Sequence, residues 1–381
     1  MRIAVPTETF ANEARVSATP ETVKKYVAAG CEVVVQQGAG EASNIPDAMF
    51  VEAGAKVAGT FAETCKGAGL VLKVRGPSSD EIEKLEKNTA VVALFSPFSN
   101  PLLHDYNGAG LTCFSMEMVP RISRAQSMDV LSSQANVAGY KAVLLALEHY
   151  RSFMPMLMTA AGTVQPAKVL VMGAGVAGLQ AIATARRLGA MVEAFDVRPA
   201  AKEQVESLGA KFVEVPSEED AEDAGGYAKE MSDEYKQKQA ELIHQHAIAA
   251  DIIVTTALIP GRPAPVLITE EAVGAMKPGS VIVDMAVEAG GNCPLSEMDS
   301  VWQKDGVTLV GISNIPALMA ADSSSLYARN LFNFVDLMLG SEEEGLNIDM
   351  DDEILESSLL CWDGEVMKPQ FFGGNAAGGE A

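Results

Sequence analysis

Short apolar runs alternate with amphipathic segments along the first third of the chain. The apolar runs predict strands at residues 2–6, 32–36, 71–74, 91–95 and 111–115, and the segments between them predict helices at 21–29 and 47–54. Strands that alternate with helices form a mainly parallel sheet with helices on its faces. The pattern therefore predicts an α/β, doubly wound first domain.

The alternation resumes after a long helical pattern at residues 132–150. Strands are expected at residues 168–172, 191–195, 211–215, 251–255, 280–284 and 308–311, with a helix at 176–188 and a second long helix at 325–339. We therefore predict two Rossmann-like doubly wound domains, joined by the two long helices, with a cleft between them. The N-terminal domain would comprise residues 1–133 and 326–370, the second domain residues 134–325, and a flexible glycine-rich tail residues 371–381.

Composition narrows the class of protein. A length of 381 residues allows two or three domains, and a hydrophobic content of 48% excludes a mainly disordered chain. The net charge of −23 argues against binding nucleic acid or anionic membranes through bulk charge. The N-terminus lacks a signal-peptide pattern and no run of about 20 apolar residues occurs, so we expect a cytoplasmic chain. Five well-separated cysteines predict reduced thiols.

A glycine motif follows the predicted strand at residues 168–172. The sequence KVLVMGAGVAG places Gly173, Gly175 and Gly178 in a G-x-G-x-x-G pattern that opens a helix. In a dinucleotide-binding turn the first glycine permits the tight turn, the second lets the backbone approach the pyrophosphate, and the third allows close packing of helix on strand. The helix N-terminus then offers free N–H groups to phosphate.

An acidic residue stands where such a motif requires one. The next predicted strand ends at Asp196, where a carboxylate accepts hydrogen bonds from the adenosine ribose and repels the 2′-phosphate of NADP. NAD(H) is therefore favoured, although Arg198 stands two residues further on. The alternative is a Rossmann domain that has lost its ligand.

The chain offers no obvious acid–base group for ordinary dehydrogenation, which needs a proton transfer beside the hydride transfer. We expect His104 in a loop, His149 at a helix end, and His244 and His246 on the surface of a helix. No spacing of histidines suits a metal, so we predict no metal site. The acidic residues at 349–353 are interpreted as a solvated face.

One polar segment stands out before the first long helix. Residues 120–134, PRISRAQSMDVLSSQ, would line the cleft between the domains. They are either a polar loop that caps a helix at Asp129 or Ser132, or a set of donors and acceptors around a nicotinamide. A second segment, residues 217–239, is either an acidic surface insertion or a lid hinged at its glycines.

From about residue 1 to residue 333 the chain resembles the NAD(H)-binding component of proton-translocating nicotinamide nucleotide transhydrogenases. The most specific stretches are residues 120–134, 160–178, 202–209 (KEQVESLG), 225–231 (GGYAKEM), 255–269 (TTALIPGRPAPVLIT) and 288–296 (EAGGNCPLS). The resemblance implies direct hydride transfer between NAD(H) on this chain and NADP(H) on a partner subunit, coupled to proton translocation by membrane-spanning subunits. It implies the Re/Si-specific type rather than the Si-specific type, a homodimer, and a position at the cytoplasmic membrane through partners. Because such an exchange transfers no proton, it fits the lack of an acid–base histidine.

The resemblance also assigns site residues. It implies that the nicotinamide and its transfer geometry depend on Arg121, Gln126, Asp129 and Ser132. It implies cofactor contacts at Ile122, Ser123, Ser133, Gly173, Gly175, Val176, Gly178, Asp196, Val197, Arg198, Gly226, Tyr227, Gln239 and Leu258, of which Gly226 and Tyr227 match the tip of a mobile loop. Two positions depart from the family pattern, namely Thr7, where a basic residue is common, and the loop at residues 95–98.

Two other classes remain open. Alanine dehydrogenases share the two-domain plan, and Arg15 and Lys73 could bind a substrate carboxylate and carbonyl. That family places a catalytic histidine after the strand at residues 91–95, where this chain has SPFSNP. A non-catalytic protein that senses NAD is the third possibility.

Overall fold

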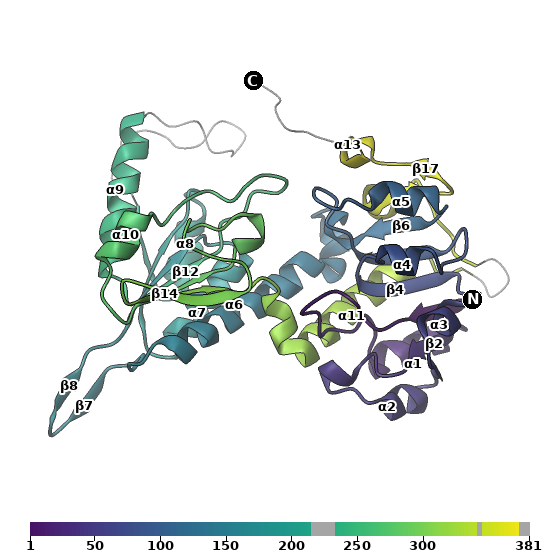
Figure 1. The fold of residues 1–381 in the computed structure, drawn as a ribbon, viewed down its shortest axis with the longest axis horizontal. Helices are drawn as coiled ribbons and strands as arrows, with labels where there is room; N and C mark the ends of the chain where they lie inside the picture. The colour runs from purple at the N-terminus through teal and green to yellow at the C-terminus, as the bar shows by residue number, and fades with distance from the viewer. Residues whose placement is uncertain (215–232, 341–344, 373–381) are drawn as a thin grey trace. The chain divides into compact units, whose positions relative to one another are not determined.

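The computed structural model describes residues 1–214, 233–340 and 345–372 (Figure 1). It divides into two compact units, of which unit 1 is Met1–Gln134 with Pro316–Ala381 and unit 2 is Ala135–Ile315. The long helix α6 (Val130–His149) runs across the first boundary. The chain returns to unit 1 at Pro316, before the position expected from the sequence at residue 326.

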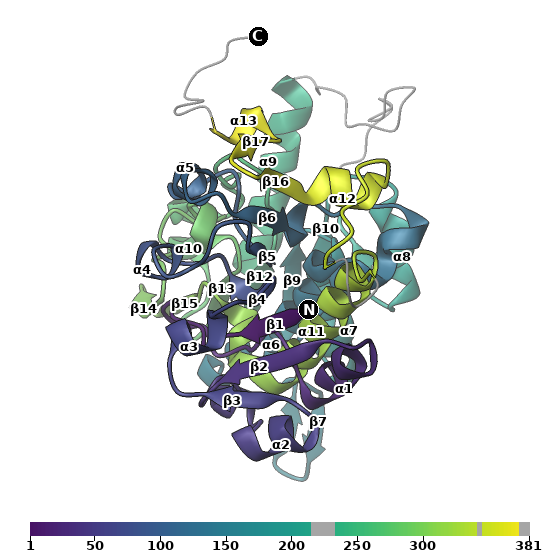
Figure 2. The ribbon, with the colours of Figure 1, turned by 90° about the vertical axis from the view of Figure 1, so that its right-hand side faces the viewer.

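Unit 1 contains a doubly wound sheet with strand order β17-β16-β6-β5-β4-β1-β2-β3, whose stack is visible in Figure 2. The strands are β1 (Arg2–Val5), β2 (Glu32–Gln36), β3 (Lys56–Ala58), β4 (Leu70–Arg75), β5 (Ala90–Leu94), β6 (Thr112–Ser115), β16 (Leu359–Trp362) and β17 (Glu365–Val366). The first six pair in parallel in the order 3-2-1-4-5-6, which is the order of dinucleotide-binding folds. The last two add an antiparallel edge.

Helices cover both faces of the unit 1 sheet. They are α1 (Pro20–Ala28), α2 (Asp47–Glu52), α3 (Phe61–Cys65), α4 (Ser79–Ile82), α5 (Leu103–Gly108), α11 (Ala320–Asp336), α12 (Glu353–Ser358) and α13 (Pro369–Phe372), with short 3-10 turns η1 (Glu41–Ser43), η2 (Met116–Met118) and η3 (Ser123–Met128). The apolar face of α11 places Tyr327, Leu331 and Phe334 in the same core as Ile3 and Leu72. That burial explains why α11 as a whole belongs to unit 1 instead of bridging the two units, as the sequence had suggested.

Unit 2 repeats the design with strand order β11-β10-β9-β12-β13-β15-β14. Its elements are β9 (Lys168–Met172), α7 (Val176–Arg187), β10 (Met191–Phe195), α8 (Ala201–Ser207), β11 (Lys211–Phe212), α9 (Asp233–Ala249), β12 (Ile252–Thr255), α10 (Glu270–Ala275), β13 (Val281–Asp284), η4 (Val287–Ala289), β14 (Ser300–Lys304) and β15 (Val307–Gly311). All pairs are parallel except that of the edge strand β14. The predicted fold class, two Rossmann-like α/β units, is confirmed.

A two-stranded hairpin projects from unit 2, formed by β7 (Leu157–Thr159) and β8 (Gly162–Val164) (Figure 1). Met156 and Met158 are 55% and 74% exposed on it, and Phe153 at its base is 53% exposed. This element was not predicted from the sequence, because strands of three residues carry too weak a periodicity.

The C-terminal segment differs from the expected tail. Phe371 and Phe372 belong to α13, where the ring of Phe372 packs edge-on against His104 and that of Phe371 against Phe98. The tail predicted to start at residue 371 is therefore wrong for these two residues, since their rings are anchored to unit 1. Residues 373–381 lie outside the described residues. All five cysteines are described, buried and unbridged.

Candidate functional site

The turn that follows β9 has the geometry required to receive a phosphate group. A Cβ on Gly178 would lie 1.8 Å from the carbonyl oxygen of Gly173, whereas a Cβ on Gly175 would have no heavy atom within 4 Å. Gly173 has a φ of +102°, which only glycine adopts readily. Gly175 is the N-cap of α7 and supplies no side-chain cap, so the first N–H groups of the helix are available to an anion.

Thr256 joins this turn to the neighbouring strand. Its hydroxyl follows β12 and donates to the carbonyl oxygen of Gly173 at 3.0 Å. Strands β9 and β12 pair in parallel, and they flank the point where the strand order of unit 2 reverses. Ligands of doubly wound sheets bind outside the carboxyl ends of the strands at such a point. Both residues therefore lie at the place where the topology itself predicts a dinucleotide.

Asp196 follows β10 at the same edge of the sheet. Its carboxylate accepts hydrogen bonds from Ala174 N at 2.7 Å and from Arg198, whose guanidinium nitrogens both lie 2.9 Å away. Burial opposes ionisation, but the hydrogen bonds from Arg198 and from the backbone hold the pKa of Asp196 below its ordinary value. The side chain of Arg198 is 59% exposed. The carboxylate is thus fixed and ionised, while its cationic partner can move into solvent.

The chain after β12 is supported from below by a buried amide. Asn292 is fully buried, accepts a hydrogen bond from Ala257 N at 3.1 Å, and donates to the carbonyl oxygens of Ala257 and Pro265. This brace holds Leu258 in a position where it is 55% exposed. Leu258 was predicted from the sequence but Asn292 was missed, because a lone asparagine within residues 288–296 carries no spacing signal.

The polar segment of unit 1 contains a helix cap. Asp129 accepts hydrogen bonds from Ser132 N at 2.9 Å and from the Ser132 hydroxyl at 2.5 Å, just where α6 begins. Ser133 N donates to the carbonyl oxygen of Asp129. The capping interpretation of this segment is therefore correct, and it places Asp129 and Ser132 in contact with each other.

The turn η3 is anchored by two side chains and exposes others. Ala125 and Met128 are buried in the core beneath α11, whereas Arg121, Ser123 and Gln126 are exposed and Ile122 is half-buried. The exposed polar groups are free of the core packing that fixes the turn. This division between anchors and exposed donors is typical of a binding loop.

Arg124, next to Ser123, has a structural partner. Its guanidinium forms two hydrogen bonds, 2.7 and 2.6 Å long, with the carboxylate of Asp352, which also caps α12. The acidic residues at 349–353 were interpreted as a solvated face. For Asp352 that interpretation is wrong, because the carboxylate is shared between an ion pair and a helix terminus.

Arg15 and Lys73, the residues of the alanine dehydrogenase alternative, are buried in a network of carboxylates. Lys73 Nζ lies 3.1 Å from Glu81 and 3.4 Å from Glu8, and Arg15 forms hydrogen bonds of 2.6 and 2.7 Å with Glu13. Burial raises the pKa of Glu8, although the charge of Lys73 opposes the shift. The charge that a substrate carboxylate would neutralise is therefore already balanced by the protein.

The histidines have structural partners as well. His104 lies in α5 rather than in a loop, and its Nε2 is 2.7 Å from the carbonyl oxygen of Phe372. His246 is half-buried with Nδ1 2.6 Å from Glu193, so the expectation of a purely surface residue is wrong for it. After β5, where a catalytic histidine was considered, Glu117 accepts hydrogen bonds from the backbone N–H groups of Phe95 and Ser96.

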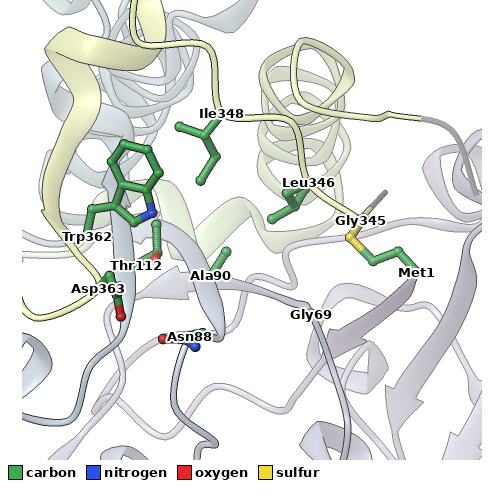
Figure 3. Close-up of a pocket in the computed structure, with 10 residues that line it drawn as sticks. All are labelled: Met1, Gly69, Asn88, Ala90, Thr112, Gly345, Leu346, Ile348, Trp362 and Asp363. Atoms are coloured by element: carbon green, nitrogen blue, oxygen red, sulfur yellow. The ribbon is translucent and has the colours of Figure 1, made fainter. Parts of the chain in front are cut away.

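A hollow of about 370 Å³ occurs in unit 1 but lies at the wrong edge for this chemistry (Figure 3). It is lined by Gly69, Ala90 and Thr112, which precede or begin β4, β5 and β6, and by Trp362. These are the amino ends of parallel strands, whereas ligands of such sheets bind at the carboxyl ends. The hollow is therefore separate from the residues predicted to bind a dinucleotide.

The predicted residues thus form two groups. Unit 2 holds Gly173, Gly175, Val176, Gly178, Asp196, Val197, Arg198 and Leu258 at the carboxyl edge of its sheet, with Gln239 half-buried on α9; unit 1 holds Arg121, Ile122, Ser123, Gln126, Asp129, Ser132 and Ser133 around η3 and the start of α6. Gly226 and Tyr227 lie outside the described residues. Among the described residues no cluster of three potential metal ligands occurs, and no described helix has the length and apolarity to cross a membrane.

Two family models match nearly the whole chain. The model "Alanine dehydrogenase/PNT, N-terminal domain" matches residues 4–138, and "Alanine dehydrogenase/PNT, C-terminal domain" matches residues 142–369. The chain belongs to the alanine dehydrogenase/PNT family. The family predicted from the sequence is confirmed.

Within the family, relatives of two kinds differ in similarity to this chain. An NAD(P) transhydrogenase subunit alpha chain of Rhodospirillum rubrum is 49% identical, covering 99% of this chain and 100% of its own length. The NAD(P) transhydrogenase subunit alpha of Haemophilus influenzae is 44% identical, covering 97% of this chain and 72% of its own length. The alanine dehydrogenase of Halomonas elongata is 30% identical over 88% of this chain and 86% of its own length.

Solved structures give the same ranking. A transhydrogenase from Sinorhizobium meliloti superposes with a TM-score of 0.87 at 50% identity, covering 96% of this chain and all of its own. An L-alanine dehydrogenase superposes with a TM-score of 0.81 at 25% identity, covering 97% and 98%. This family member is therefore more similar to these transhydrogenases than to these alanine dehydrogenases.

Proposed function

We propose that this chain is the NAD(H)-binding subunit of a proton-translocating NAD(P) transhydrogenase of the Re/Si-specific type. It would exchange a hydride directly between NAD(H) bound to unit 2 and NADP(H) bound to a partner subunit. The observation that carries the proposal is the open turn of Gly173, Gly175 and Gly178 beside a fixed, ionised Asp196. The transhydrogenase subunits that match the chain along its length support the same reaction.

The residues present fit a bound NAD(H). Gly175 and Val176 would take the pyrophosphate at the N-terminus of α7, and the carboxylate of Asp196 would take the adenosine ribose hydroxyls, with Val197 and Arg198 beside it. Gly178 keeps helix and strand close enough for this turn. Leu258, Gln239 and the segment containing Gly226 and Tyr227 would complete the contacts.

The loop of unit 1 would position the nicotinamide. We infer that Arg121, Ser132 and the neighbouring Ile122, Ser123 and Ser133 hold the amide and ribose region, and that Gln126 and Asp129 set the ring for transfer. Direct hydride exchange needs no protein acid or base. Catalysis then depends on positioning, because the reacting carbons must approach to about 3–3.5 Å.

The partners follow from the reaction. We propose an NADP(H)-binding subunit and membrane-spanning subunits that translocate protons, with this chain peripheral to the cytoplasmic membrane through them. We further propose a homodimer in which the hairpin of β7 and β8 contacts a second copy. An isolated hairpin is marginally stable in water, and Met156 and Met158 are exposed on this one.

Mixing the protein with the NADP(H)-binding subunit of a transhydrogenase tests the proposal. NADH plus an oxidised NADP analogue of distinct absorbance should then give hydride exchange that requires both proteins. Formation of NADH from NAD and alanine, without exchange, would instead assign an amino-acid dehydrogenase. Binding of NADH with neither reaction would assign an NAD sensor.

A further inference from the structure

The loop that carries Gln126 is tied to the start of α6 by a buried amide side chain. Asn330 lies on α11, is 8% exposed, and donates from Nδ2 to the carbonyl oxygen of Ser127 at 2.7 Å. Its Oδ1 accepts a hydrogen bond from the Ser133 hydroxyl, also at 2.7 Å. Both ends of the amide are therefore used, one on η3 and one on the first turn of α6.

The two anchored positions flank the residues proposed to act on the nicotinamide. Ser127 directly follows Gln126, and Ser133 directly follows Ser132, which is bonded to Asp129. A displacement of Asn330 would therefore change the position of Gln126 relative to Asp129. The buried apolar anchors of η3, Ala125 and Met128, hold the turn against the core, but their side chains form no directional bond to α6.

A second amide offers a natural comparison. Asn333, one turn later on α11, donates to the same carbonyl oxygen of Ser127 at 3.1 Å, but it is only half-buried. Hydrogen bonds that are short and removed from water contribute more to a fixed geometry than longer, solvated ones. Asn330 also reaches Ser133, and it thereby joins the two halves of the loop.

We propose that Asn330 is a positioning residue for hydride transfer, which acts by holding Gln126 in register with Asp129 and Ser132. This inference rests on the proposed function. It adds a residue outside the 120–134 segment to the machinery of transfer. Misplacement of a reacting group by about 1 Å can cost a factor of about 100 in rate.

The test is a cycle of four proteins in the mixing assay: wild type, Asn330→Leu, Gln126→Ala and the double variant. Leucine has a similar volume but neither donates nor accepts. Asn330→Leu should lower the rate of hydride transfer at saturating nucleotide by about 10- to 100-fold, with the Kd for NADH within about twofold of wild type. In the Gln126→Ala background the same change should lower the rate by less than about twofold, because the positioned group is already absent.

Control and outcomes separate the inference from the proposed function. Asn333→Ala should cost less than about threefold in rate. If wild type shows no exchange, the proposed function fails; if wild type is active and Asn330→Leu matches it, only the positioning role fails. Equal losses in both backgrounds would mean general structural damage and would overturn the inference. Should Asn330→Leu not fold, Asn330→Asp, which keeps the acceptor for Ser133, is measured in the same cycle with the same criteria.

Discussion

At the carboxyl end of β10, both oxygens of Asp196 accept hydrogen bonds, and one of the partners is the exposed Arg198. This arrangement bears on the choice between NAD(H) and NADP(H). The carboxylate would repel a 2′-phosphate, but a guanidinium that left it could attract one. Because the low pKa keeps Asp196 ionised and its side chain is only 6% exposed, we expect the carboxylate to dominate.

Asp196→Asn should therefore weaken NADH binding by about 10-fold or more, as expected for loss of a charged hydrogen-bond acceptor worth about 1.5–3 kcal/mol. It should also reduce the preference for NADH over NADPH, which fluorescence titration with both nucleotides measures. The matched control is Arg198→Ala, which removes the cation and leaves the carboxylate, and should keep the preference for NADH. A preference that survives Asp196→Asn would remove Asp196 from the determinants of specificity.

At the scale of the element, the turn between β9 and α7 uses its three glycines differently. Gly178 has no room for a side chain because the carbonyl oxygen of Gly173 occupies the space, whereas Gly175 faces open space with an ordinary φ of −75°. One glycine is therefore needed for packing and another for access by the ligand. The sequence motif alone assigned these roles, and the geometry of the turn agrees with both.

Two alanine variants separate the roles. Gly178→Ala should destabilise unit 2 by about 1–3 kcal/mol, because α7 must move off the turn, and it should also weaken NADH binding. Gly175→Ala should leave the melting temperature unchanged and still weaken NADH binding, since the new methyl group fills the approach to the pyrophosphate. Thermal unfolding and NADH titration of both variants check this. Normal NADH affinity in Gly175→Ala would show that the pyrophosphate does not bind there.

Elements with strong periodicity were predicted from the sequence, and β2, β9 and β10 have the expected bounds. The edge strands β14 and β16 were missed, because their pairing depends on partners distant in sequence or on an antiparallel turn without a strong signal. The site followed the same rule. Motif residues such as Gly173 and Asp196 were found, whereas Asn292 and Asn330 act through single hydrogen bonds that only the folded chain brings together.

At the scale of the whole molecule, the hairpin of β7 and β8 is the element of unit 2 that its own sheet explains least. It pairs only with itself as a two-stranded sheet. Its apolar side chains, Met156, Met158 and Val164, are 55%, 74% and 36% exposed. Burying a methionine side chain contributes about 1.5–3 kcal/mol, so a second copy that covered these groups would stabilise both hairpins.

Met158→Asp should therefore convert the proposed dimer to a monomer, since the carboxylate would have to be buried without a partner at the interface. Sedimentation equilibrium measures the change, and NADH titration should show an unchanged Kd because the turn after β9 is untouched. Met298→Asp is the matched control: Met298 is 62% exposed in unit 2 outside the hairpin, so its variant should remain dimeric. If Met158→Asp remains a dimer, or if wild type is already a monomer, the hairpin does not form the interface. Loss of dimerisation together with full NADH binding would show that the assembly and the dinucleotide site depend on separate parts of unit 2.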